Sequence, residues 1–120
     1  MTTHMRQEVD EIPEAAARLL TQSAASIREA GKALRDKDPA FLITIARGSS
    51  DHAAHFLKYA IEQTAGRAVA SIGPSLASIY GKSLKLDQAA AISISQSGKS
   101  PDIVALARSA TQSGALTISL

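Results

Sequence analysis

The amino-acid sequence predicts an α/β protein, a three-layer α/β/α sandwich built around a parallel sheet. Four short apolar runs, at residues 41–46, 68–72, 89–94 and 115–120, alternate with segments whose apolar residues recur at helical spacing. The runs at 41–46 and 89–94 are apolar at nearly every position, which is typical of strands covered on both faces. Strands that alternate with helices pair in parallel through right-handed crossovers, so we expect a flavodoxin-like strand order of 2-1-3-4.

The N-terminal elements follow from apolar spacing and from Pro and Gly positions. Residues 5–35 have the pattern of a helix, and Pro13 predicts a break into a short leading helix and a longer one. Asp38-Pro39 predicts a turn before the first strand. A helix then follows residues 47–51, and Gly66 is placed to end it.

The second half of the chain repeats this alternation. Residues 75–80 fit a short helix between the second and third strands. Ser100 suits the N-cap of the last helix, Pro101 its first position and Asp102 its first turn, so this helix is expected over residues 101–112. Gly114 would close it before the fourth strand.

These elements predict an N-terminal helical leader over residues 1–37 and one α/β domain over residues 38–120. The sequence stops on the fourth strand, without a following loop or helix. We therefore expect the front part of a longer polypeptide, incomplete at the C-terminal edge of its sheet. Folded alone, it would expose apolar surface and self-associate, so we expect a homodimer.

Composition excludes several classes of function. The 120 residues carry a formal net charge of only +2 and 3% aromatics, so a nucleic acid is not an expected partner. The absence of cysteine excludes disulfides, thiolate catalysis and Cys-zinc sites. No apolar stretch suits a signal peptide or a membrane span, so we expect a cytoplasmic protein with no membrane partner.

The candidate site combines the two glycine- and serine-rich turns that follow the first and third strands. In the order 2-1-3-4 the connections reverse between these two strands, and ligands of open α/β sheets bind at such a point. One turn contributes Gly48, Ser49 and Ser50, and the other contributes Ser95, Gln96, Ser97, Gly98 and Ser100. Glycines allow close backbone approach, hydroxyls bond phosphate or sugar oxygens, and a helix N-terminus favours an anion.

Other sites fit the sequence less well. The segment Gly98-Lys99-Ser100 resembles the end of a P-loop, but Ser93 stands where that motif needs a glycine, and no dinucleotide-binding glycine pattern is present. Apart from Asp51, no carboxylate joins His52 and His55 at a matching spacing, so we interpret the two histidines as solvated or hydrogen-bonded and expect no metal. No nucleophile elbow surrounds Ser50 or Ser97.

Two segments resemble the sugar isomerase (SIS) domain family: residues 46–53, Ala-Arg-Gly-Ser-Ser-Asp-His-Ala, and residues 93–102, Ser-Ile-Ser-Gln-Ser-Gly-Lys-Ser-Pro-Asp. The leader around Met5 to Pro13 resembles the helix before the first SIS domain of two-domain enzymes. These enzymes include SIS-type glucosamine-6-phosphate deaminases and the isomerase half of glucosamine-6-phosphate synthase. The deaminases are the closer match, because the synthase usually has Gly-Thr-Ser-Tyr and Ser-Gly-Glu-Thr-Ala-Asp in the two turns.

The resemblance implies a hexose or hexosamine 6-phosphate ligand and no cofactor. Ser95, Ser97 and Ser100 would bind the phosphate, with help from the Gln96 and Gly98 backbone, and Ser50 would face the sugar beside Gly48 and Ser49. The family's acid/base Glu, its ring-opening His and its Lys fall outside these residues, so no catalytic residue is expected in this chain and it would be inactive alone. Arg47 and Lys99 depart from the synthase pattern, and their roles stay open.

The resulting hypothesis is the N-terminal SIS domain of an enzyme that isomerises and deaminates glucosamine 6-phosphate. The alternatives are the phosphosugar-sensing SIS module of a regulator, the isomerase domain of a glutamine:fructose-6-phosphate aminotransferase, and a structural α/β domain whose turns hold no ligand. A regulator would usually carry a helix-turn-helix ahead of the SIS domain. The aminotransferase would need an N-terminal Cys nucleophile, which is absent here.

Overall fold

The computed structural model describes residues 1–120 and contains five helices and four strands. Residues Met1–Ala33 and Leu34–Leu120 form two separate compact units. The elements, in chain order, are α1 (His4–Gln22), α2 (Ala24–Lys37), β1 (Phe41–Ile45), α3 (Ser49–Ala65), β2 (Val69–Ser71), α4 (Ser75–Ser78), β3 (Ala89–Ser93), α5 (Pro101–Gln112) and β4 (Leu116–Ser119). The domain boundary expected between residues 37 and 38 stays a prediction.

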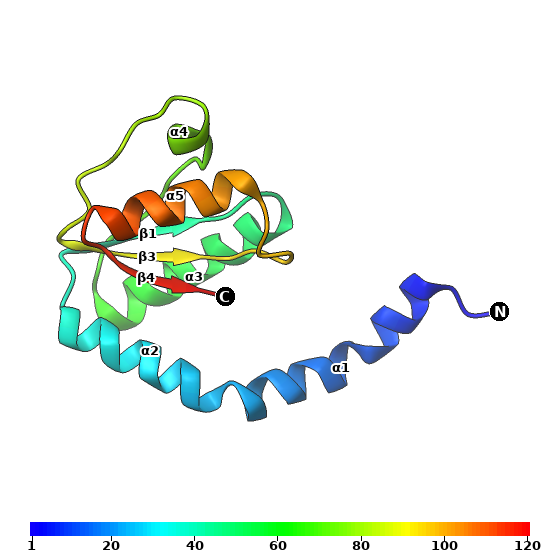
Figure 1. Ribbon diagram of the computed structural model, residues 1–120. Helices are drawn as coiled ribbons and strands as arrows, with labels where there is room; N and C mark the ends of the chain where they lie inside the picture. The colour runs from blue at the N-terminus through cyan, green and yellow to red at the C-terminus, as the bar shows by residue number, and fades with distance from the viewer. The chain divides into compact units, whose positions relative to one another are not determined.

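The four strands form one parallel sheet in the order β2-β1-β3-β4. In Figure 1 the arrows of β1, β3 and β4 point the same way, and the loops that follow β1 and β3 leave from the same end of the sheet. The register places Ile45 beside Ser93 and Ser93 beside Ser119. The predicted α/β class and the strand order 2-1-3-4 are both confirmed.

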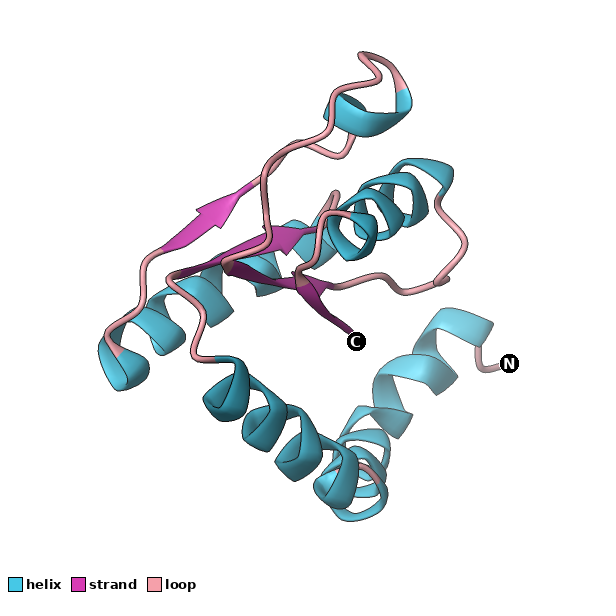
Figure 2. Cartoon of the chain, turned by 60° about the vertical axis from the view of Figure 1, so that its left-hand side comes forward, coloured by secondary structure: helices cyan, strands magenta, loops and turns pink.

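Apolar side chains alternate between the two faces of the sheet and form two cores. Ile43, Ile45 and Ala91 pack with Leu106 of α5 on one face. Leu42 and Ile92 face the other side, where Leu57 and Ile61 of α3 cover them. All five residues of β3 are buried, as expected for a strand between two helical layers. Figure 2 shows helices on both sides of the strands.

β1 leads into α3 on one face of the sheet, and β3 leads into α5 on the other face. This arrangement determines where the candidate site lies. α3 leads from β1 to the edge strand β2, whereas α5 leads from β3 to the other edge strand, β4. The two connections therefore diverge from neighbouring strands. A crevice between diverging connections is the place where open α/β sheets bind ligands.

The predicted break at Pro13 is wrong. α1 continues through Pro13 to Gln22, and the helix is interrupted at Ser23. All of α1 is exposed, so the carbonyl that loses its partner at proline can bond water instead. Ser23 ends one helix by donating its N–H to the Leu19 carbonyl, and its own carbonyl accepts from Ile27 in the next helix.

None of the helices combines the length and the hydropathy that crossing a lipid bilayer requires.

Candidate phosphate-binding site at the sheet reversal

The two predicted turns begin side by side at the carboxyl end of β1 and β3. The Ile94 N–H donates to the Ile45 carbonyl at 3.0 Å, which extends the pairing one step beyond β3. The next N–H, of Ser95, donates to the Leu120 carbonyl at 3.2 Å. These bonds fix the base of the 95–100 turn against both neighbouring strands, so the sheet positions the serine-rich segment.

The serine hydroxyls of this turn bind its own backbone. Ser95 Oγ accepts from the Gly98 N–H at 3.1 Å, and Ser97 Oγ accepts from the Lys99 N–H at 3.2 Å. A hydroxyl that accepts through its oxygen still has its hydrogen to donate. Ser95 and Ser97 can therefore donate to a ligand oxygen while the turn holds their oxygens in place. The Gly98 N–H, which the resemblance assigned to phosphate, is already used within the turn.

The turn ends at the N-terminus of α5, as the sequence predicts. Ser100 is the N-cap and its carbonyl accepts from the Val104 N–H at 3.0 Å, while Pro101 and Asp102 lie in the first turn. The half-buried Ser100 makes no side-chain capping bond. Its hydroxyl is consequently not used to cap the helix, and the first amides of α5 keep the partial positive charge that favours an anion.

The other turn brings Gly48, Ser49 and Ser50 to the N-terminus of α3. Gly48 is the N-cap, with φ 61° and ψ −133°, a conformation that side-chain-bearing residues rarely adopt. Ser49 is exposed and Ser50 is half-buried in the first turn. A Cβ at Gly48 or at Gly98 would meet no atom within 4 Å, so the protein leaves open space above both glycines.

An ion pair that sequence analysis missed joins the two turns. Arg47 Nη2 lies 2.6 Å from Asp102 Oδ2, so the turn after β1 contacts the first turn of α5. No local pattern could reveal this pair, because the partners are far apart in sequence and meet only through the pairing of β1 with β3.

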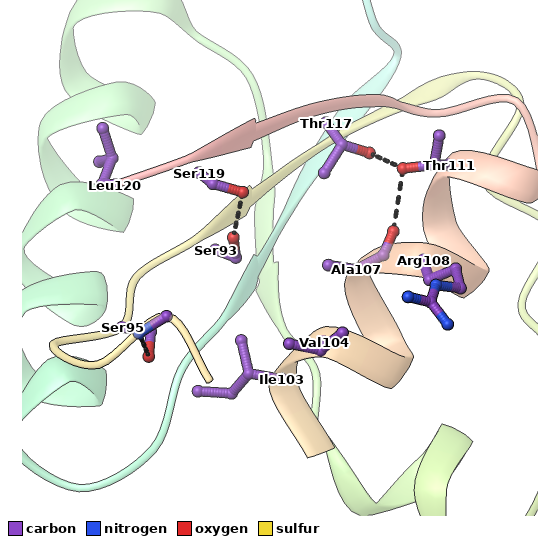
Figure 3. Close-up of a pocket in the computed structure, with 11 residues that line it drawn as sticks. Ser93, Ser95, Ile103, Val104, Ala107, Arg108, Thr111, Thr117, Ser119 and Leu120 are labelled. Atoms are coloured by element: carbon purple, nitrogen blue, oxygen red, sulfur yellow. Dashed lines mark hydrogen bonds between the residues drawn. The ribbon is translucent and has the colours of Figure 1, made fainter. Parts of the chain in front are cut away.

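A pocket of about 390 Å³ lies between α5 and β4, next to the 95–100 turn. Of the predicted residues, Ser95 and Gly98 line it. Figure 3 shows its hydroxyl pairs: Ser93 donates to Ser119 at 2.9 Å, and Thr111 lies 2.8 Å from Thr117. The alternation of hydroxyl residues in β4 was the available signal for this lining. Ser97, Ser100 and the Gly48 turn lie outside the pocket, so it is a neighbour of the candidate site.

The two histidines of α3 are both exposed. His55 Nδ1 lies 2.9 Å from the Asp51 carbonyl oxygen, one turn back in the helix. This contact agrees with the interpretation of a hydrogen-bonded side chain near a helix start. No group of three or more His, Asp or Glu side chains is arranged to hold a metal ion.

Comparison with solved structures gives two informative matches. One is a “putative phosphosugar isomerase” from Silicibacter pomeroyi DSS-3, with 52% sequence identity and a TM-score of 0.91 over 98% of this chain and 36% of that one. The other is tagatose-6-phosphate ketose/aldose isomerase from Escherichia coli, with 23% identity and a TM-score of 0.75 over 98% of this chain and 33% of that one. The second match supports the fold alone. The chain spans about a third of the length of either protein.

A search of curated proteins found no match. The family model of the SIS domain matches residues 34–120, which include both turns, the whole sheet and the helices α3 to α5. This chain belongs to the SIS domain family.

Proposed function

We propose that residues 38–120 bind a hexose or hexosamine 6-phosphate, and that they form the N-terminal SIS domain of an enzyme that isomerises and deaminates glucosamine 6-phosphate. The 52% identity to a protein described as a phosphosugar isomerase supports a phosphosugar ligand. The deaminase assignment rests on the sequence of the two turns, Arg-Gly-Ser-Ser-Asp-His-Ala and Ser-Gly-Lys-Ser-Pro-Asp.

One observation carries the binding proposal. Ser95 and Ser97 have their oxygens tied to amides of the same turn, and this turn leads into the uncapped N-terminus of α5. Their hydroxyl hydrogens, the Ser100 hydroxyl and the helix amides are all donors. A phosphate dianion has only acceptor oxygens, so a ring of donors on a helix N-terminus suits it. The sugar would extend toward Gly48, Ser49 and Ser50.

A ligand titration tests the proposal. The folded protein should bind glucosamine 6-phosphate and fructose 6-phosphate by calorimetry, and should bind glucosamine much more weakly, because the phosphate supplies most of the contacts. Replacing Ser97 by Ala should weaken binding about tenfold or more, the usual effect of losing a hydrogen bond to a charged group. Ser83→Ala, at an exposed loop serine, is the matched control.

The outcomes separate the hypotheses. Equal affinity for glucosamine and its 6-phosphate, or equal affinity of the Ser97 and Ser83 variants, would refute the proposed site. Ammonia release from glucosamine 6-phosphate by the whole protein would support the deaminase. Tight binding without turnover of any hexosamine phosphate would instead favour a sensor.

A further inference from the structure

Arg47 and Asp102 connect the two turns of the proposed site. Arg47 follows β1 and directly precedes Gly48, whereas Asp102 is the second residue of α5. The 2.6 Å contact between Arg47 Nη2 and Asp102 Oδ2 crosses the point where the connections from β1 and β3 diverge. Any change in the spacing of the two turns must stretch or break this ion pair.

Asp102 also places a negative charge close to where the proposed phosphate would bind. A carboxylate in the first turn of a helix interacts favourably with the helix dipole, as a bound anion does. The two negative groups would repel each other if the carboxylate had no partner. The guanidinium of Arg47 cancels most of this repulsion without occupying the hydroxyls of Ser95, Ser97 or Ser100.

Because the Arg47–Asp102 pair is partly exposed, we expect it to affect ligand binding more than the stability of the fold. The side chains of Arg47 and Asp102 are 49% and 31% exposed, and ion pairs at such positions add little to stability because water screens them. The same pair can still alter ligand affinity, since it lies between the two segments that would hold the ligand.

We propose that Arg47 is a positioning residue for the sugar-phosphate site. Acting through Asp102, it neutralises the carboxylate that would otherwise repel a phosphate bound between the turns at Gly48 and at Ser95. This inference rests on the proposed function and extends it to the specificity for a doubly charged ligand.

A double-mutant cycle tests the route through Asp102. Arg47→Met should weaken glucosamine 6-phosphate binding about tenfold, as expected for one uncompensated charge beside a dianion at a partly screened site. Adding Asp102→Asn to this variant should restore most of the loss, because the repelling charge is gone. Arg47→Lys should retain most of the affinity because it keeps the positive charge.

A second ligand separates charge compensation from simple loosening of the site. A hexose 6-sulfate has the shape of the 6-phosphate but only one negative charge, so Arg47→Met should lower its affinity by a smaller factor. Equal losses for sulfate and phosphate would overturn the inference. Equal losses in the Arg47→Met and double variants would also overturn it, because they would make Arg47 a direct ligand of the phosphate.

The two proposals fail differently. If the unaltered protein binds neither the 6-phosphate nor the 6-sulfate, the proposed function and the proposed role of Arg47 are both wrong. If the unaltered protein binds the 6-phosphate but Asp102→Asn rescues nothing, the role of Arg47 is wrong and the binding site stands. Far-ultraviolet circular dichroism of each variant shows whether a loss of binding reflects loss of the fold.

Discussion

The backbone conformation of Gly98 places its N–H where it can bond the Ser95 hydroxyl. Its φ of 65° lies in the left-handed region, and its N–H reaches Ser95 Oγ only because the chain reverses there. A Cβ would meet no protein atom within 4 Å, so the requirement for glycine comes from the dihedral angle and not from crowding. The open space above Gly98 is available to a ligand.

Replacing Gly98 by Ala should therefore harm binding more than stability. The left-handed conformation costs a residue with a side chain about 1 kcal/mol, part of which is offset by the lower entropy of the unfolded chain. Gly66→Ala is the matched control, because Gly66 has φ 63°, equally open space, and a place at the far end of α3. Both variants should lose similar stability in urea, but only Gly98→Ala should lose sugar-phosphate affinity. Equal affinities would argue against close approach of the ligand to Gly98.

At the scale of secondary-structure elements, Lys37 at the end of α2 forms hydrogen bonds with the segments that precede two strands of the sheet. Lys37 Nζ donates to the Asp87 carbonyl at 2.9 Å and to the Gly114 carbonyl at 3.0 Å. Asp87 precedes β3 and Gly114 precedes β4, so this ammonium group joins the entry points of two neighbouring strands. It lies at the end of the sheet opposite to the candidate site.

Lys37→Met should lower the free energy of unfolding by about 1 kcal/mol, because it keeps the aliphatic stem but removes both bonds from a solvent-exposed cation. Ligand affinity should not change. Lys85→Met, at another exposed lysine, is the control. Urea unfolding followed by circular dichroism measures both, and an equal loss in the two variants would mean that the Lys37 bonds contribute nothing.

The sequence predicts those elements of the structure that depend on neighbouring residues, such as buried strands and helix starts. The apolar runs at 41–46 and 89–94 gave β1 and β3 to within one residue, and the Ser-Pro-Asp signal placed α5 over residues 101–112 as observed. Pro13 misled the prediction, because its penalty depends on whether water can reach the freed carbonyl, and that is a property of the folded surface. The Arg47–Asp102 pair was equally inaccessible, since it exists only once β1 lies beside β3.

At the scale of the whole molecule, the parallel order β2-β1-β3-β4 explains why two distant segments can share a ligand. The carboxyl ends of β1 and β3 are neighbours, so the turns at Gly48 and Ser95 meet although more than forty residues separate them. The helices that follow lie on opposite faces of the sheet, and open α/β sheets generally bind ligands where connections diverge in this way. Topology therefore brings the two turns together, and the proposed site would take its hydrogen-bond donors from their serines and amides.

The leader helix α1 presents an apolar stripe without burying any residue. Val9, Ile12 and Leu19 recur at helical spacing, and these residues are 49%, 59% and 59% exposed. An amphipathic helix is stabilised mainly by covering such a stripe. We propose that a second copy of the chain covers it in a homodimer.

Replacing Ile12 and Leu19 by Lys should therefore convert the dimer into a monomer, as measured by sedimentation velocity, because two charges would have to be buried in the interface. Gln7→Lys with Thr21→Lys adds the same charge to the opposite face of α1 and should leave the dimer intact. Since α1 lies outside the domain that holds both turns, monomeric protein should still bind a hexose 6-phosphate. A monomeric unaltered protein, or an unaltered dimer after the stripe substitutions, would refute this role for α1.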